Sequence, residues 1–177
     1  MYHRFGQSLS PRRIKFTPLE IVMKRNLFSS FVLLAIMGAA LCLSVDAQSR
    51  GESDVFDLVN RERSRAHLGR LTWDDGLAQV ARDYSRRMAR EGFFDHYDPT
   101  GKTVMDRAAR LRNWSSIGEN LFVCDEHASF AATAIQGWMN SKTHRTNMLD
   151  RGWTATGIGI ATARDGSIFI TQVFTRE

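Results

Sequence analysis

The chain has 177 residues and a formal net charge of +5, with 24 Lys and Arg against 19 Asp and Glu. This length suits one ordinary domain. A hydrophobic content of 43% is near the globular average and excludes a disordered, collagen-like or coiled-coil chain. The two cysteines are too few for a disulfide-dense mini-protein or a four-cysteine zinc site.

The segment 23–47 has the pattern of an export signal. A short cationic start at Met23 precedes an apolar core over 31–43, and small residues follow at Val45 and Ala47. This order predicts a signal peptide that is cleaved after Ala47. The core of thirteen residues is short for a membrane span of about 20, so no stable span is expected after cleavage. A retained N-terminal anchor is the alternative.

Residues 1–22 precede that signal and do not fit it, since a signal peptide begins at its initiator Met. We expect Met23 to be the true start and residues 1–22 to be an upstream extension. The alternative is an unusually long cationic region that starts at Met1. The remaining organisation is then a linker over 48–52 and one domain over 53–177, secreted to an extracellular or periplasmic space.

The positive charge belongs largely to the leader. Residues 1–47 hold six Lys and Arg and two Asp and Glu, so residues 48–177 hold 18 of the 24 basic and 17 of the 19 acidic residues, a net of +1. A nearly neutral domain argues against a nucleic-acid partner. Cys124 is the one cysteine after the leader, so no disulfide can form within the domain.

Helical patterns come first in the domain. Ser53 or Asp54 is expected to cap a first helix that Gly69 ends, and residues 71–73 form a short extended piece. A second, strongly amphipathic helix opens at Asp74–Asp75 and closes at Gly92. Its opposite face carries four arginines that we expect to face solvent: Arg82, Arg86, Arg87 and Arg90.

The later part turns to strands. A capping box at Thr103 and Asp106 predicts a short helix to Leu111, followed by a strand over 117–123. Helices are expected over 128–140 and 142–149. Two β-rich runs, 157–163 and 167–174, flank an Asp-Gly pair that favours a hairpin. Helices first and strands late predict an α+β domain with an antiparallel sheet.

Three polar residues stand out as site candidates. His96 and His144 lie near element ends, and Glu119 lies between apolar neighbours. Together they can bind zinc with an open position, act as a general acid/base pair, or form a hydrogen-bonded structural cluster. Their spacing carries no specificity, and the chemistry of the residues alone favours the structural cluster. Cys124 is a possible nucleophile, although its apolar surroundings favour a packing role.

Motifs in order over residues 54–174 resemble the CAP (SCP-like) domain of bacterial secreted type. They are Leu58-Val59-Asn60-Arg61-Glu62-Arg63, Leu71-Thr72-Trp73-Asp74, Phe93-Phe94-Asp95-His96, Gly118-Glu119-Asn120-Leu121, Trp138-Met139-Asn140-Ser141, His144-Arg145-Thr146-Asn147-Met148-Leu149, Gly157-Ile158-Gly159 and Ile170-Thr171-Gln172-Val173-Phe174. The resemblance implies a three-layer α-β-α sandwich with a central antiparallel sheet, and an extracellular protein.

The resemblance also implies a central cleft. In animal and plant members this cleft holds two His and two Glu and can bind a divalent metal. His96 matches the first His and Glu119 the first Glu, whereas Ser141 stands for the second Glu and Phe169 for the second His. His144 belongs to the bacterial motif, and the sequence leaves open whether it enters the same cleft.

The function favoured by this resemblance is a monomeric, non-enzymatic binding module for a lipid, sterol-like or cell-envelope ligand. The expected cleft residues are His96, Glu119, Asn120, Ser141, His144 and Gln172. One alternative is a non-catalytic envelope or host-interaction protein. Another is a metal-assisted hydrolase or protease, in which His96, Glu119 and His144 hold a divalent cation such as zinc.

Overall fold

The computed structural model describes residues 50–111, 114–125 and 129–176. The chain divides into two compact units, Met1–Ser44 and Val45–Glu177, and all described residues belong to the second. Its three hydrophobic clusters lie within that unit, so we expect Val45–Glu177 to fold on its own. Among the described residues, no helix has the length and apolar character needed to cross a membrane.

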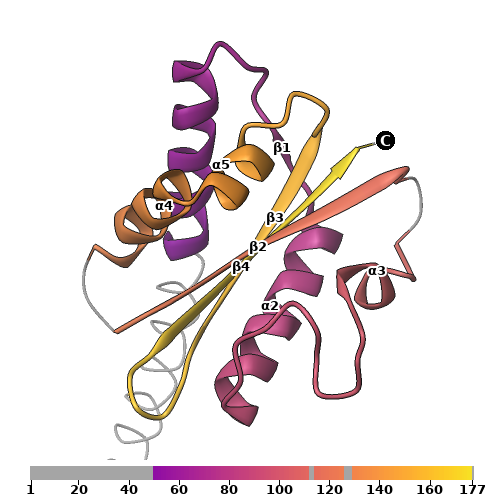
Figure 1. Ribbon diagram of the computed structural model, residues 1–177, viewed down its shortest axis with the longest axis vertical. Coiled ribbons are helices and arrows are strands. Elements are labelled where there is room, and N and C mark those ends of the chain that lie inside the picture. The colour runs from indigo at the N-terminus through magenta and orange to yellow at the C-terminus, as the bar shows by residue number, and fades with distance from the viewer. Residues whose placement is uncertain (1–49, 112–113, 126–128, 177) are drawn as a thin grey trace, which may run out of the picture. The chain divides into compact units, whose positions relative to one another are not determined.

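The described unit is a sheet between two layers of helices, and this confirms the α+β sandwich. The N-terminal helix, α4 and α5 cover one face, and α2 and α3 cover the other (Figure 1). The elements are the N-terminal helix, described over 50–65, β1 (Thr72–Trp73), α2 (Asp75–Glu91), α3 (Val104–Arg107), β2 (Ser116–Cys124), α4 (Phe130–Asn140), α5 (Lys142–Met148), β3 (Ala155–Thr162) and β4 (Ile168–Arg176).

The strand order is β1-β3-β4-β2. The three long strands are antiparallel, as predicted, and the hairpin between β3 and β4 turns at Gly166 with a φ of 90°. The two-residue β1 pairs in parallel with β3, so the sheet is mixed. A parallel neighbour is possible because most of the domain lies between β1 and β3 in the chain.

Helix α2 has the predicted ends. Asp74 caps it by accepting a hydrogen bond from the Leu77 amide at 2.8 Å, and Gly92 ends it with a φ of 70°. The capping box of Thr103 and Asp106 is also present, but α3 stops at Arg107 rather than at Leu111. Local capping signals therefore gave the start of both helices correctly.

The prediction for the N-terminal helix was wrong at both ends. Ser53 and Asp54 lie inside the helix, whose described part already begins at residue 50, and it ends at residue 65, before Gly69. His67 adopts a φ of 56° after that end. At the start, buried Glu52 pairs with Arg82 of α2, a tertiary contact that fixes the upstream turn and that a local cap signal does not report.

Two glycines of β3 let α2 lie unusually close to the sheet. A Cβ atom on Gly157 or Gly159 would come within 2.0 Å of the α2 backbone nitrogen of Ala78 or Arg82. The close approach lets Ser85 Oγ donate to the Gly159 carbonyl at 2.9 Å. Helix α2 is thus fixed to the sheet, and it carries the loop that follows it to the edge strand β2.

Candidate functional site

The site lies on the edge strand β2, where alternate side chains point to opposite faces of the sheet. Glu119 pairs in register with Val173 and faces α2 and α3. Its neighbour Asn120 pairs with Gln172 and faces α5. The two residues of the same motif therefore serve different layers.

Glu119 joins His96 and Arg107 in one cluster, which we call the His–Glu–Arg cluster. His96 Nδ1 lies 2.8 Å from Glu119 Oε1, and Arg107 Nη2 donates to Glu119 Oε2 at 2.5 Å. The Glu119 side chain is 3% exposed and that of Arg107 is 11% exposed, whereas His96 is 52% exposed. The buried Arg107 cation thus compensates the buried Glu119 carboxylate. The same carboxylate also bonds the imidazole of His96, which lies at the surface.

Arg107 is held by more than the ion pair. Its guanidinium carbon lies 3.4 Å from the centre of the Tyr84 ring, and Nη1 donates to the carbonyls of His96 at 3.2 Å and Lys102 at 3.1 Å. These contacts tie α3 to the loop that carries His96. The sequence analysis missed Arg107, because an arginine at the end of a short helix gives no signal of the carboxylate it meets.

The loop between α2 and α3 is ordered by a second buried carboxylate. Asp98 accepts from the Thr100 hydroxyl and amide, the Lys102 amide and Arg87. The Thr100 hydroxyl, the backbone amides and the Arg87 charge hold the pKa of Asp98 well below its usual range, although burial opposes them. The Tyr84 hydroxyl adds a hydrogen bond to the Asp95 carbonyl at 2.5 Å. This loop therefore holds His96 in place.

The arginine face of α2 was predicted to be only solvated, and that prediction was wrong for two of its members. Arg87 bonds buried Asp98, and Arg82 makes two hydrogen bonds to buried Glu52. Arg86 and Arg90 pair with exposed or partly exposed carboxylates of α2 itself. The helical spacing of the arginines could not distinguish solvated arginines from those that pair with a buried carboxylate, because the two buried carboxylates come from other segments.

His144 lies in α5 and belongs to the layer on the other side of the sheet from α2 and α3 (Figure 1). Its Nδ1 lies 2.8 Å from Ser141 Oγ at the junction of α4 and α5. The hydrogen bond to Glu119 raises the pKa of His96, whereas burial and the nearby charge of His96 lower the pKa of His144. The contacts of the His144 side chain and carbonyl are with Ser141 and Asn120, not with the His–Glu–Arg cluster.

The other two predicted cleft residues are buried. Asn120 is 1% exposed and donates to the His144 carbonyl at 3.1 Å, and Gln172 is fully buried and donates to Thr156 Oγ1 at 3.2 Å. Neither side chain offers an atom to an external ligand in this structure. Asn120 instead positions α5, and Gln172 lies within the sheet's core.

Two side chains close the free edge of β2. Asn147 Nδ2 donates to the Glu119 carbonyl at 3.1 Å, and Trp138 Nε1 donates to the Leu121 carbonyl at 2.9 Å. Asn147 also donates to Asn120 Oδ1 at 3.0 Å. An edge strand whose carbonyls are capped in this way offers little to a pairing strand. The bacterial motif residue Asn147 thus has a structural role that sequence spacing did not reveal.

The donor set does not fit a divalent metal. Both oxygens of Glu119 are engaged, one of them by the cation of Arg107. Within residues 50–111, 114–125 and 129–176, no three His, Cys, Asp or Glu side chains group as metal ligands. A catalytic zinc site normally has three protein ligands, so we derive no metal-dependent step from this arrangement.

Cys124 does not show the surroundings of a nucleophile. Burial and the charge of Asp125 raise the pKa of its thiol. A reactive cysteine needs a lowered pKa, usually from a neighbouring cation. Its side chain instead packs against the cluster on the α4 face.

Exposed apolar side chains gather on the segments that build the His–Glu–Arg cluster. In the described part of the chain, the exposed large apolar residues are Phe94, Tyr97, Met105 and Val123. Phe94 and Tyr97 lie within two residues of His96, and Met105 lies in α3 with Arg107. Val123 is on the same face of β2 as Glu119 and pairs with Phe169, whose ring lies 6.4 Å from that of Phe94.

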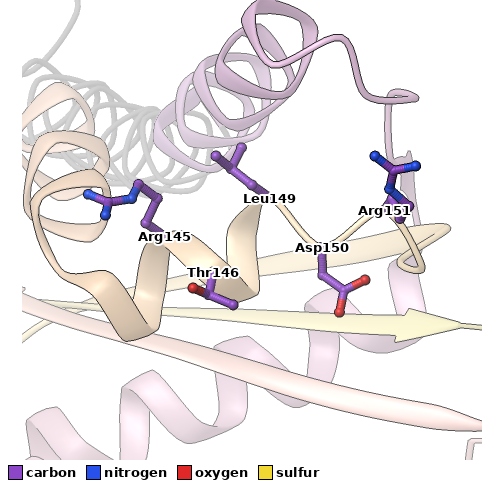
Figure 2. Close-up of a pocket in the computed structure, with 5 residues that line it drawn as sticks. All are labelled: Arg145, Thr146, Leu149, Asp150 and Arg151. Atoms are coloured by element: carbon purple, nitrogen blue, oxygen red, sulfur yellow. The ribbon is translucent and has the colours of Figure 1, made fainter.

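Two pockets lie on different parts of the domain. One of about 250 Å³ lies against α2 and is lined by Val80, Asp83, Tyr84, Arg87 and Arg107, so it shares Arg107 with the cluster. The other, of about 450 Å³, lies on α5 and the turn after it (Figure 2). Its lining residues, Arg145, Thr146, Leu149, Asp150 and Arg151, include none of the predicted site residues.

The model of the Cysteine-rich secretory protein family, CAP, matches residues 56–174. The chain belongs to the CAP family. This CAP domain is 37% identical to an extracellular protein containing a SCP domain from Bacillus anthracis, with a TM-score of 0.63 over 73% of this chain and 41% of that one. It is 31% identical to the uncharacterized protein YkwD of Bacillus subtilis, over 68% of this chain and 46% of that protein.

The CAP domain also resembles an outer surface protein from Borrelia burgdorferi, with a TM-score of 0.67 and 18% identity over 73% of this chain and 95% of that one. At this identity the likeness concerns the fold alone. The chain spans less than half the length of YkwD and of the Bacillus anthracis protein. The chain is therefore a CAP domain of bacterial type, and its relatives include an extracellular protein.

Proposed function

We propose that this CAP domain is an exported binding module, and that its ligand is an amphiphilic lipid of the cell envelope. The supporting observation is the half-exposed imidazole of His96 in the same loop as two exposed aromatic side chains, Phe94 and Tyr97. Exposed apolar residues that gather beside a polar group are typical of a site for a ligand of mixed character. Neither the hydrolase nor the host-interaction alternative has an observation of this kind.

The polar end of the ligand would meet His96. Its Nδ1 is directed at Glu119, and no described residue makes a hydrogen bond to Nε2, which leaves that atom for a ligand. The hydrogen bond to Glu119 raises the pKa of His96, so its ring carries a proton over a wider pH range than a free imidazole. When His96 is protonated, Arg107 and His96 outweigh the charge of Glu119, and the cluster suits a phosphate or carboxylate headgroup.

The apolar end would lie over Phe94 and Tyr97. Full burial of a large apolar side chain contributes roughly 1.5–3 kcal/mol, so two such residues supply at most about 6 of the about 8 kcal/mol that micromolar binding requires, and the charged contact must supply the rest. Both side chains already project from a loop that Asp98 holds in place, which lowers the entropy cost of ordering on binding. Binding then needs no change in the fold.

The test is co-sedimentation of the Val45–Glu177 unit with vesicles of phosphatidylcholine and phosphatidylglycerol in equal parts. We expect the Phe94→Ser/Tyr97→Ser double variant to bind at least about tenfold more weakly, because it loses apolar area worth more than about 1.4 kcal/mol. The Arg145→Ser/Arg151→Ser variant on the α5 pocket is the matched control and should bind like wild type if headgroup contact occurs at His96. Equal binding by the wild type and the apolar variant would contradict the proposal.

Export and monomeric state are part of the same proposal. The predicted signal peptide over 23–47 and the extracellular type of relatives support secretion. Mass spectrometry of the exported protein should find an N-terminus at Gln48, and a precursor peptide covering Arg12 to Glu20 would overturn Met23 as the start. Size-exclusion chromatography with light scattering should give the mass of one copy.

A further inference from the structure

The His–Glu–Arg cluster contains a fixed cation at the place where a metal would have to bind. We propose that Arg107 is the resident counter-cation of Glu119, and that it closes this site to divalent metal ions. The proposal is independent of the lipid ligand. It concerns which positive charge compensates the buried carboxylate, and it predicts that removal of Arg107 turns the site into one that accepts zinc.

The first support is the occupancy of both carboxylate oxygens. Oε1 faces His96 Nδ1 at 2.8 Å, and Oε2 accepts from Arg107 Nη2 at 2.5 Å. Glu119 is 3% exposed, so its charge needs a partner within the protein. A metal ion at Oε2 would have to displace the guanidinium, and one at Oε1 would have to displace the imidazole proton.

The second support is how firmly Arg107 is held. Its guanidinium stacks on the Tyr84 ring at 3.4 Å and donates to two backbone carbonyls, of His96 and Lys102. A guanidinium is always charged and has a fixed set of donors, so it cannot leave by losing a proton. Tyr84 itself is anchored, since its hydroxyl donates to the Asp95 carbonyl at 2.5 Å.

The third support is what stands around the carboxylate. Ser141, which is not a carboxylate, bonds His144 Nδ1 at 2.8 Å. Glu119 and His96 are thus the two metal-ligating side chains in direct contact here, with Arg107 as the compensating charge. Without Arg107, this carboxylate and this imidazole could ligate zinc, and water would complete a four-coordinate shell.

The experiment is a zinc titration of the Val45–Glu177 unit, by isothermal calorimetry and by the melting temperature with zinc or with EDTA. We expect the wild type to melt at the same temperature in both. Arg107→Met replaces the guanidinium with an uncharged side chain of similar length. We expect this variant to have a lower melting temperature than the wild type in EDTA and to regain at least about 5 °C with excess zinc. Arg107→Lys keeps a cation and should respond to zinc no more than the wild type.

The control is the double variant Arg107→Met/Glu119→Gln, which removes the carboxylate and should lose the zinc response. The proposal would be overturned if the wild type binds zinc and Glu119→Gln abolishes that binding. This comparison can be made even if Arg107→Met fails to fold. A folded Arg107→Met variant that shows no zinc response would overturn it as well. Equal weak zinc binding by every variant, with no added shift for Arg107→Met, would place the ion elsewhere and would also overturn it.

Discussion

Glu119 and Asn120 are neighbours on one strand and enter opposite layers of the domain. Asn120 lies in a neutral amide network with Asn147, packed under α5, where every partner belongs to the fold. Glu119 lies in a charged cluster whose outermost member, His96, is half exposed. The comparison shows that one residue of a motif can join a buried amide network while the next holds a half-exposed imidazole at the surface.

The two faces also differ in how they are buried. The face of α4 and α5 has the larger apolar cluster, with Trp138, Ile158 and Phe174 fully buried. The face of α2 has smaller clusters, between which the charged side chains of Arg107 and Glu119 are accommodated. We therefore expect substitutions on the first face to affect stability alone, and those on the second to affect ligand binding and the response to pH as well.

The largest expected effect is on the α4 face. Trp138→Ala removes a fully buried ring that packs on Phe122 and a hydrogen bond to the Leu121 carbonyl. It should lower the free energy of unfolding by about 3–5 kcal/mol, measured by urea denaturation. A loss below about 1 kcal/mol, well under that range, would show that this face is not the main source of stability. Trp138→Phe, which keeps most of the packing, is the matched variant.

The second effect is on the charged face. Glu119→Ala leaves the buried Arg107 without its carboxylate and should cost about 3 kcal/mol, at the low end for a broken buried pair because His96 is half exposed. Glu119→Gln keeps the shape and separates the loss of charge from the loss of packing. If Glu119→Ala unfolds at the same urea concentration as the wild type, the ion pair does not support the fold.

A smaller effect is expected for Asn147→Ala. It removes the hydrogen bonds to the Glu119 carbonyl and to Asn120 Oδ1, and it exposes the β2 edge. We expect a loss of about 1–3 kcal/mol from the unpaired buried groups, together with unchanged vesicle binding, since no atom of the binding surface changes. Weaker vesicle binding by a folded Asn147→Ala protein would contradict the separation of the two faces.

The smallest effect is the pH dependence of the His96 contribution. Glu119 raises the pKa of His96 in the folded state, so the stability from this pair is complete below the unfolded value of 6.5 and is lost as the pH rises through the folded pKa. The lowered pKa of His144 works in the other direction, because the stability that its neutral ring contributes is lost as the pH falls.

Because His96 is half exposed, the difference in the free energy of unfolding between wild type and His96→Gln should stay under about 1 kcal/mol. Urea unfolding at about pH 5.5 and about pH 8.5, on either side of the imidazole titration, measures it, and a larger difference at the higher pH would have the wrong sign.

Much of the fold follows from local signals. Asp74, Gly92, the Thr103 capping box and the Asp-Gly hairpin all act within a few residues, and each is found where the sequence places it. The start of the N-terminal helix was missed because it depends on the pairing of Glu52 with Arg82, thirty residues away. Parallel pairing of β1 was missed for the same reason, since its partner comes more than eighty residues later.

Only part of the site could be predicted from the sequence. His96 and Glu119 were named as candidates, and the structure brings them together. Arg107, Tyr84 and Asn147 were missed. Their partners come from other segments of the chain, and the sequence around each residue does not indicate them. Gln172 and Asn120 were expected to face a ligand, but strand alternation turns both toward the α5 layer, where they are buried.

The central claim is that His96 is held by a metal-free pair with Glu119, which Arg107 compensates. The most direct measurement is an NMR titration of the His96 imidazole in the Val45–Glu177 unit, in EDTA and in excess zinc. We predict a His96 pKa above the ordinary value of 6.5, a proton on Nδ1, and the same titration curve with and without zinc. A His96 pKa below that value, or a zinc-induced shift of the His96 signals that Glu119→Gln abolishes, would contradict the account.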